Sequence, residues 1–500
     1  MRLRRWSVSR KRALAPCSEL CCESLVVAVA VLLALTGGTV VIKVASAKSL
    51  SQFTIPTSPE ATIPGGSGPW DVTFDPANDY LYVADFGSSN VTVINTSTYQ
   101  VVTQIPLTFG IQTIVTDTAT GLVYTANTVS TVYAISPLTN QVASTTSVAP
   151  ESSPEVQTYD AANGDIYVTD LVSNVVSVIH GAAVVATIPV GVSPNGAAYD
   201  SANGEVFVSN EGSTVPANLT VIDGTANQVV GQVYPSGNGP GVAYASSNRD
   251  VYTCTNGIQD GFSNLVSVAS GTTNQVVTSI PISSACGGDV YDPSNGYVYV
   301  TDRDKPGGQD QSNVTLIDPD TNRVVLTQPV QLAPIGIAYD SANHNVYVAD
   351  SGTDNISILP QIYRLTVHET GLPNGTNWSA MIGGTTFSST TPSVTFPEPN
   401  GTFDFTIGSV VNRSASPFTG TVTVSGGPQE LNLTFSNSKG GGLSSGLFGL
   451  PGATGYYVLG GFVALLVAAV AVVVVLTRRK RRAKPSPTTP PPDGATGRDR

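Results

Sequence analysis

Residues 74–105 read FDPANDYLYVADFGSSNVTVINTSTYQVVTQI, and the chain states this phrase in seven related copies. Each copy opens with a polar turn and continues with short β-branched runs such as LYVAD, VTVIN and VVTQI. The position of Asp75 recurs every 40 to 48 residues and is occupied by Asp75, Asp117, Asp160, Asp200, Ala245, Asp292 and Asp340. Four short β runs with a period in the forties are typical of a β-propeller, in which each repeat forms one four-stranded blade.

The two ends of the repeat array indicate a closed ring. The seventh copy, YDSANHNVYVADSGTDNISILP, ends at Pro360 without a fourth run, whereas PEATIPGGSGP at residues 59–69 precedes the first copy and matches the missing strand. We therefore expect Ala61–Pro64 to complete the last blade, so that residues 59–360 form a seven-bladed β-propeller without an open sheet edge. An open solenoid would instead need polar caps.

The strand sequences carry a resemblance to known families. VYVAD, IYVTD, VYVTD and VFVSN resemble the YVTN-type β-propeller repeats of archaeal surface-layer proteins and of the bacterial periplasmic YncE-like family. The resemblance covers residues 59–360 and implies the propeller fold. It implies no particular activity, because this repeat hosts diverse functions and shares no catalytic motif.

A second all-β domain is expected at residues 362–436, where short alternating strands are separated by PNG turns. The pattern predicts a small β-sandwich. Its phrases ETGLPNGTNW and EPNGTFDF resemble a module that recurs in large archaeal cell-surface proteins. We interpret it as a spacer whose Trp378 packs in its own core, the alternative being an adhesive or sugar-binding module built on Trp378.

The ends of the chain predict a membrane-anchored surface protein. Residues 1–47 combine a basic start with an apolar run, which is typical of a secretory signal peptide or an uncleaved signal anchor. Residues 437–455 are a Gly/Ser-rich stalk, and residues 456–476 are 21 uncharged residues that predict a transmembrane helix. Because five basic residues follow this helix, we expect the Pro-rich tail at residues 477–500 to be cytoplasmic and the domains between the two ends to be extracellular.

The charge pattern narrows the partners and the medium. Eight basic and 31 acidic residues lie between residues 48 and 454, a formal charge of −23, which disfavours nucleic-acid binding. Ten N-x-S/T sequons in this section are consistent with an exported surface. Charged residues are only 12% of the chain, so the fold depends little on ion pairs and would keep its interactions in acid. We expect an acid-living archaeon as the source.

Some residues break the repeat near the start of the innermost strand, where the other copies have Gly or an apolar side chain. They are Trp70, Asp71, Glu155 and Asp289. We expect them near the mouth of the central channel, as ligand-binding candidates. No cofactor is required, but converging carboxylates at Asp71, Glu155 and Asp289 would suit Ca²⁺ or another divalent cation. Some seven-bladed lactonases bind a metal in this region of the fold. Their metal ligands have no residue-by-residue match in this sequence.

The loops between strands two and three are longest in the fourth to sixth blades, which makes this sector the expected contact for protein or glycan partners. Its further ligand-binding candidates are Asp260, Asp302, Asp304 and Lys305. One Asp or Asn ends strand two of every blade: Asp85, Asn127, Asp170, Asn210, Asn256, Asp302 and Asp350. We interpret this ring as Asx turns that cap each hairpin, in preference to a ring of cation ligands.

The remaining reactive side chains give little support for catalysis. His180, His344 and His368 are expected away from the channel, so no histidine is placed to activate a nucleophile. Cys254 and Cys286 form either a disulfide or two semi-buried thiols. The sequence therefore favours a non-enzymatic surface protein for adhesion, envelope assembly or ligand capture. The alternative is a metal-dependent hydrolase of lactonase type.

Overall fold

The computed structural model describes residues 59–149, 153–212, 217–235, 239–255, 264–303 and 312–438. Within these ranges every regular element is a β-strand, and the strands form nine four-stranded sheets. The all-β prediction is therefore confirmed for the described part of the chain. In the same part there is no apolar helix of membrane-spanning length. The signal or anchor segment, the stalk, the transmembrane helix and the tail predicted from the sequence lie outside the described residues.

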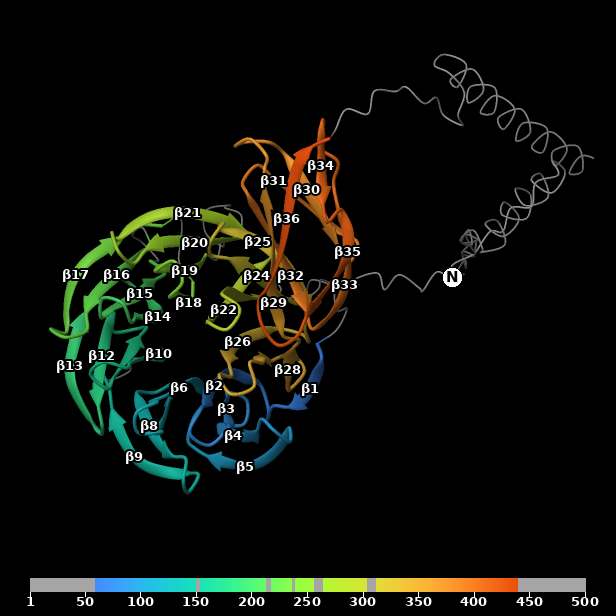
Figure 1. Cartoon of the computed structure of the whole chain (residues 1–500). Coiled ribbons are helices and arrows are strands. Elements are labelled where there is room, and N and C mark those ends of the chain that lie inside the picture. The colour runs from blue at the N-terminus through green and yellow to red at the C-terminus, as the bar shows by residue number, and fades with distance from the viewer. Residues whose placement is uncertain are drawn as a thin grey trace, which may run out of the picture. The chain divides into compact units, whose positions relative to one another are not determined.

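Seven of the sheets, numbered here in chain order, are arranged around a common centre (Figure 1). The innermost strands are β2 (Pro69–Asp75), β6 (Ile111–Thr116), β10 (Pro154–Asp160), β14 (Pro194–Asp200), β18 (Val242–Ala245), β22 (Ala285–Asp292) and β26 (Pro334–Tyr339). The second strands are β3 (Tyr80–Asp85), β7 (Val123–Asn127), β11 (Asp165–Asp170), β15 (Glu205–Asn210), β19 (Asp250–Thr255), β23 (Tyr297–Arg303) and β27 (Val346–Asp350).

The outer half of each sheet continues the antiparallel order. The third strands are β4 (Asn90–Asn95), β8 (Thr131–Ser136), β12 (Val175–His180), β16 (Asn218–Asp223), β20 (Leu265–Ser270), β24 (Asn313–Asp318) and β28 (Asn355–Leu359). The outermost strands are β5 (Gln100–Pro106), β9 (Gln141–Ser147), β13 (Ala183–Pro189), β17 (Gln228–Val233), β21 (Gln275–Pro281), β25 (Arg323–Pro329) and, in the seventh sheet, β1 (Ala61–Pro64).

The seventh sheet is built from both ends of the repeat array. β1 pairs antiparallel with β28, with Ala61 opposite Ile358 and Pro64 opposite Asn355. One core cluster then combines Ile63 and Ile356 of the seventh sheet with Val72 of the first. The last sheet therefore packs directly against the first, and β1 covers an edge that β28 would otherwise expose.

Local chemistry explains why each repeat folds into a sheet. In the first turn, Asp75 Oδ1 accepts the amide of Ala77 at 2.9 Å, the Asx turn that starts the hairpin. The second and third strands are almost fully buried because neighbouring sheets cover both faces. Their tyrosines also bond the next sheet: the Tyr252 hydroxyl donates to Asn322 Oδ1 at 2.6 Å. Asn322 has a φ of 51°, a left-handed conformation that asparagine tolerates.

Two further sheets follow the ring and share one hydrophobic core. Their strands are β29 (Ile362–Thr370), β30 (Trp378–Ile382), β31 (Thr385–Ser389), β32 (Ser393–Pro399), β33 (Gly401–Ile407), β34 (Arg413–Ser416), β35 (Thr419–Val424) and β36 (Gln429–Asn437). Trp378 is 3% exposed, and its indole donates to the Thr391 carbonyl at 2.8 Å. A side chain buried in this way is not available as a sugar platform.

Arg364 lies on β29 and connects these two sheets to the sixth sheet of the ring. Its guanidinium donates to Asp318 Oδ1 at 2.5 Å and to the Asn295 carbonyl at 2.9 Å, and it lies 4.9 Å above the Tyr297 ring. Arg364 is one of the few basic side chains in this part of the chain. It is largely buried, and its guanidinium is used in these structural contacts.

Candidate functional site

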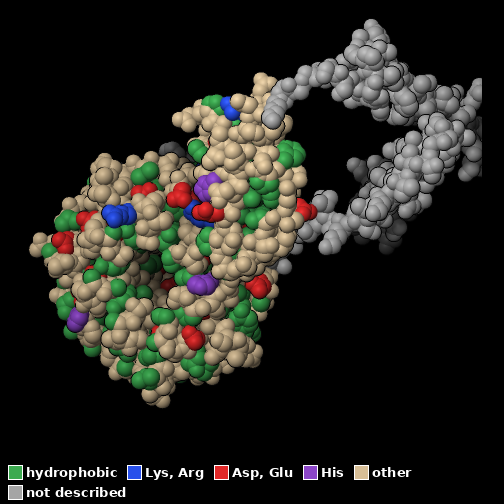
Figure 2. Space-filling model, in the orientation of Figure 1, with side chains coloured by type: hydrophobic (Ala, Val, Ile, Leu, Met, Phe, Trp, Pro, Cys, Tyr) green, Lys and Arg blue, Asp and Glu red, His purple; other side chains and the backbone are tan. Residues whose placement is uncertain are grey.

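The ring of seven sheets encloses a cavity of about 710 Å³. The innermost strands of all seven sheets contribute to its wall, and the surface is hollowed at the centre of the ring (Figure 2). Trp70, Asp71, Glu155 and Asp289 all line this cavity. The structure thus brings together the four residues that break the repeat at the start of the innermost strand.

Asp71 is held in the wall by backbone amides. Its Oδ1 accepts the amide of Val72 at 2.9 Å, and its Oδ2 accepts the amide of Ile114 on the next sheet at 3.0 Å. The backbone of Asp71 can lie this close to the seventh sheet only because residue 336 is a glycine: a Cβ at Gly336 would lie 2.5 Å from the Asp71 Cα. Burial raises the pKa of Asp71 to about 7, even though both amide bonds act to lower it.

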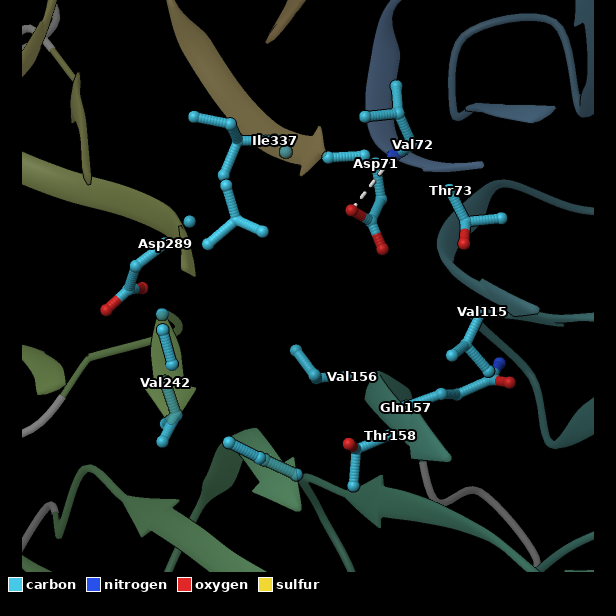
Figure 3. Close-up of a pocket in the computed structure, with 18 of the residues that line it drawn as sticks. Asp71, Val72, Thr73, Val115, Val156, Gln157, Thr158, Val242, Asp289 and Ile337 are labelled. Atoms are coloured by element: carbon cyan, nitrogen blue, oxygen red, sulfur yellow. Dashed lines mark hydrogen bonds between the residues drawn. The ribbon is translucent and has the colours of Figure 1, made fainter. Parts of the chain in front are cut away.

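Asp289 lies on the opposite side of the opening and points away from Asp71 (Figure 3). Its carboxyl group occupies the space of the missing side chain of Gly241, since a Cβ there would be 1.5 Å from Asp289 Oδ1. Burial raises the pKa of Asp289 well above its ordinary value. In the structure Cys254 and Cys286 beside it form a disulfide between the fifth and sixth sheets, with their Cα atoms 5.7 Å apart.

Glu155 belongs to a polar group that spans the second to fourth sheets. Gln112 Nε2 lies 3.5 Å from Glu155 Oε2, and Asn195 Nδ2 donates to Glu211 Oε1 at 2.5 Å. Burial, assisted by the nearby charge of Glu211, raises the pKa of Glu155 to about 7. Burial also raises the pKa of Glu211, so both carboxyl groups of this polar group favour the protonated form more than a free glutamate does.

The three carboxyl groups do not form a metal site in the described structure. No three His, Cys, Asp or Glu side chains gather there closely enough to hold one ion. Asp71 uses its oxygens on backbone amides, and Asp289 is turned toward Gly241 on its own side. The expected Ca²⁺ or other divalent-cation site at Asp71, Glu155 and Asp289 therefore lacks a shared ligand position among the described residues.

Trp70 is the fourth of these residues and forms a stack at the rim. Its ring lies 5.2 Å from the Phe86 ring, and the Arg303 guanidinium lies 5.4 Å above it. Arg303 ends β23 of the sixth sheet, so the stack connects the sixth sheet with the first. An aromatic ring beside a cation offers a contact for a planar group of a ligand.

The structure corrects the expectation for Asp302. This side chain is 0% exposed and accepts hydrogen bonds from Thr315 at 2.7 Å and Ser283 at 3.2 Å, so it cannot contact a ligand. The candidates Asp260, Asp304 and Lys305 lie outside the described residues, as does most of the long-loop sector. Their roles stay predictions.

The Asx-turn interpretation of the ring that contains Asp302 is correct only in part. Asn127 accepts the amides of Val129 and Thr131, as an Asx turn requires. The aspartates instead accept a hydroxyl from the third strand of their own sheet, at 2.5–2.7 Å. These pairs are Asp85 with Thr92, Asp170 with Ser177, Asp302 with Thr315, and Asp350 with Ser357. These four aspartates therefore also link the second strand to the third strand of their own sheet.

Sequence reasoning missed the aromatic residues at the other end of the cavity. The residue before the Asp75 position is aromatic in six of the seven repeats, and all six side chains line the cavity. They are Phe74, Tyr159, Tyr199, Tyr244, Tyr291 and Tyr339. The recurrent Tyr-Asp dipeptide in the sequence could have pointed to these aromatic residues. It escaped notice because it belongs to the repeat and does not break it.

The positions of the three histidines bear on whether the cavity could support hydrolysis. None of the three histidines lines it. His180 lies 2.8 Å from Asp165, and His344 Nδ1 lies 2.6 Å from the Tyr339 hydroxyl. His344 is therefore the histidine that contacts a lining hydroxyl, although it is not itself among the described lining residues.

Comparison with known proteins supports the fold and gives no activity. No family model matches the chain, and no curated protein matches its sequence. A chain of the hydrazine synthase of Kuenenia stuttgartiensis is similar over 60% of this chain and 96% of its own, with a TM-score of 0.52 and 15% identity. A chain of a mitotic checkpoint complex is similar over 73% of this chain and 99% of its own, with a TM-score of 0.53 and 10% identity. The described structure therefore has a β-propeller-like fold.

Proposed function

We propose that this protein is a non-enzymatic binding protein of the cell surface. In this proposal a seven-bladed β-propeller stands on a β-sandwich spacer and captures a ligand in its central cavity. The observation that carries it is the cavity of about 710 Å³, which lies within the range of pockets that hold small ligands. Its described wall offers hydrogen-bonding and aromatic groups, which suit the non-covalent capture of a ligand.

The architecture supports the propeller and the spacer. Seven consecutive four-stranded sheets with a shared core between the first and the last are consistent with a closed seven-bladed ring. The buried Trp378 favours a spacer over a second binding module. The YVTN-type strands, similar to those of archaeal surface-layer proteins, add to this proposal.

The location is proposed from the chain ends and the acidic middle section. Residues 1–47 would export the chain, and residues 456–476 would hold it in the membrane as an integral protein, with the tail at 477–500 in the cytoplasm. The ectodomain would then meet protein or glycan partners and no nucleic acid. Buried carboxyl groups with raised pKa values suit an acidic exterior, since they fold best when protonated.

Surface labelling of intact cells tests this topology. Leu138→Cys places a thiol at a position that is 95% exposed in the ring of sheets, and Ser486→Cys places one in the tail. A membrane-impermeant maleimide should label the full-length Leu138→Cys variant on intact cells, and the Ser486→Cys variant only after lysis. The unsubstituted chain controls for its own cysteines. Equal labelling of both variants on intact cells would contradict the proposed orientation.

Native mass spectrometry of the full-length protein in detergent tests ligand capture. The protein purified from its own membrane should carry a non-covalent molecule that is released without chemical change. Val242→Phe narrows the cavity wall and should lower its occupancy, whereas Val411→Phe, at a position that is 86% exposed in the two-sheet region, should not. Release of a cleaved product would support the hydrolase alternative instead.

A further inference from the structure

The aromatic residues at the end of the innermost strands form a second, distinct part of the cavity wall. We call Tyr159, Tyr199, Tyr244, Tyr291 and Tyr339 the tyrosine mouth. All five are half-buried. They come just before the short turns that join the first and second strands. The tyrosine mouth therefore lies at the opposite end of the channel from Trp70, Asp71 and Glu155, which lie near the start of their strands.

Hydrogen bonds hold four of these five rings. The hydroxyls of Tyr159, Tyr199 and Tyr244 each bond the turn aspartate of the preceding sheet, which is Asp117, Asp160 and Asp200 respectively. The Tyr339 hydroxyl bonds His344 at 2.6 Å. A ring held in this way loses little further conformational entropy when a ligand packs on it, so the mouth is pre-organised for binding.

The wall around these rings carries hydroxyl and amide groups and no cation. Ser201, Ser246 and Ser341 line the same cavity, and no Lys or Arg is found among its described lining residues. Deeper in the wall, Gln157 is 6% exposed, and neither polar atom of its amide has a partner in the described structure. A buried amide without a partner is costly unless a ligand or water bonds it.

Half-exposed aromatic rings beside uncharged donors and acceptors match the chemistry of sugars. The C–H faces of a sugar pack on aromatic rings, and its hydroxyls bond amide and hydroxyl groups. Building on the proposed function, we propose that the tyrosine mouth binds a neutral oligosaccharide, which enters from the short-turn end. A charged sugar is disfavoured because no described lining side chain neutralises a carboxylate or sulfate.

Isothermal titration of the full-length protein in detergent tests the proposal. Cellohexaose, mannohexaose and chitohexaose serve as neutral probes, and hexagalacturonate as a charged one. At least one neutral hexasaccharide should bind, and more tightly than hexagalacturonate. The double variant Tyr199→Ala/Tyr244→Ala should lose at least tenfold in affinity, because two stacking rings are removed.

Two further variants separate ring contact from folding. Tyr199→Phe/Tyr244→Phe removes the hydroxyl bonds but keeps both rings, so it should lower stability while keeping affinity within about threefold. Tyr234→Ala removes a tyrosine that is 58% exposed and outside the cavity wall, and it should bind like the unsubstituted protein.

Failure of all three neutral probes to bind would overturn the inference. It would also be overturned by preferred binding of hexagalacturonate, or by unchanged affinity in the double alanine variant. In each case the surface-labelling and mass-spectrometric results would stand separately, so loss of this inference is distinguishable from loss of the proposed function.

Discussion

Asp350→Asn is expected to flatten the pH dependence of folding stability. Asp350 is 0% exposed and accepts a hydrogen bond from Ser357 at 2.6 Å, while its Oδ1 has no partner in the described structure. Burial raises the pKa of this carboxyl group from 3.8 to about 7. The charged form is therefore the one that the folded protein disfavours.

The sign and the size follow from proton linkage. Between pH 3.8 and about 7 the folded protein holds a proton that the unfolded chain has lost, so the free energy of unfolding falls as the pH rises. The stabilisation is complete below pH 3.8 and is lost as the pH passes 7. Raising the pKa from 3.8 to about 7 corresponds to roughly 4 kcal/mol for this one side chain.

Thermal unfolding followed by circular dichroism between pH 4 and pH 8 measures the effect. At pH 4 the variant should be less stable by about 1 kcal/mol, because the added amide N–H lacks an acceptor. At pH 8 it should be more stable, with a melting temperature higher by roughly 5 °C for a folded region of this size. The chain itself carries Asn127 and Asn210 at the equivalent positions, so asparagine fits there.

Asp404→Asn makes the same chemical change at an exposed position and should leave the pH dependence of the melting temperature unchanged. The reasoning is refuted if the difference in melting temperature between Asp350→Asn and the unsubstituted protein is the same at pH 4 and pH 8. The reasoning would also be refuted if the variant, compared with the unsubstituted protein, were less stable at pH 8 than at pH 4, because the sign of the pH effect would then be opposite.

Four other changes test the packing of the ring. Replacing both Cys254 and Cys286 by Ser opens a loop with a sequence separation of 32 and should cost roughly 3–4 kcal/mol in denaturant unfolding, an effect that a reductant should reproduce in the unsubstituted protein. Tyr252→Phe removes the 2.6 Å bond to Asn322 and should cost about 1 kcal/mol by the same assay, whereas a cost near zero would show the bond to be neutral. Deleting residues 59–64 removes β1 and exposes the edge of β28, so the shortened protein should unfold at a lower temperature and self-associate in light scattering. An unchanged melting temperature without self-association would show that β28 tolerates an open edge. Thr116→Tyr should raise the melting temperature at pH 7, because the new hydroxyl can reach Asp75.

Much of the fold follows from the sequence because one local rule is repeated. The Asp-x-x-Asn turns, the β-branched runs and the strand-like fragment at 59–69 each act over a few residues, and their period alone implies four-stranded units. The pairing of β1 with β28 is a long-range contact, yet a missing strand at one end and a spare strand at the other made it foreseeable.

The candidate site was less accessible to sequence reasoning. Position along the strand correctly placed Trp70, Asp71, Glu155 and Asp289 in one cavity wall. It could not reveal that Asp289 turns toward Gly241, since that depends on a missing Cβ in the neighbouring sheet. Nor could it foresee that Asp302 is buried beneath Thr315, because the Asx turn and the strand-to-strand bond require the same residue type.

The turn aspartates are hydrogen-bond partners for three tyrosines of the mouth, Tyr159, Tyr199 and Tyr244. Burial raises the pKa of Asp117, but bonds from Thr120, Tyr159 and the turn amides lower it below its ordinary value. In the sheet that follows Asp75, the position of these tyrosines is occupied by Thr116, whose hydroxyl pairs with Thr73 at 3.1 Å. Its Oδ2 is buried without a partner in the described structure, and burial raises its pKa. The hydroxyls of Tyr159, Tyr199 and Tyr244 therefore contact the preceding sheet, while their rings line the channel. Since phenylalanine at position 74 fills the wall without a hydroxyl, the ring and the hydroxyl have separable roles, and binding should follow the ring alone.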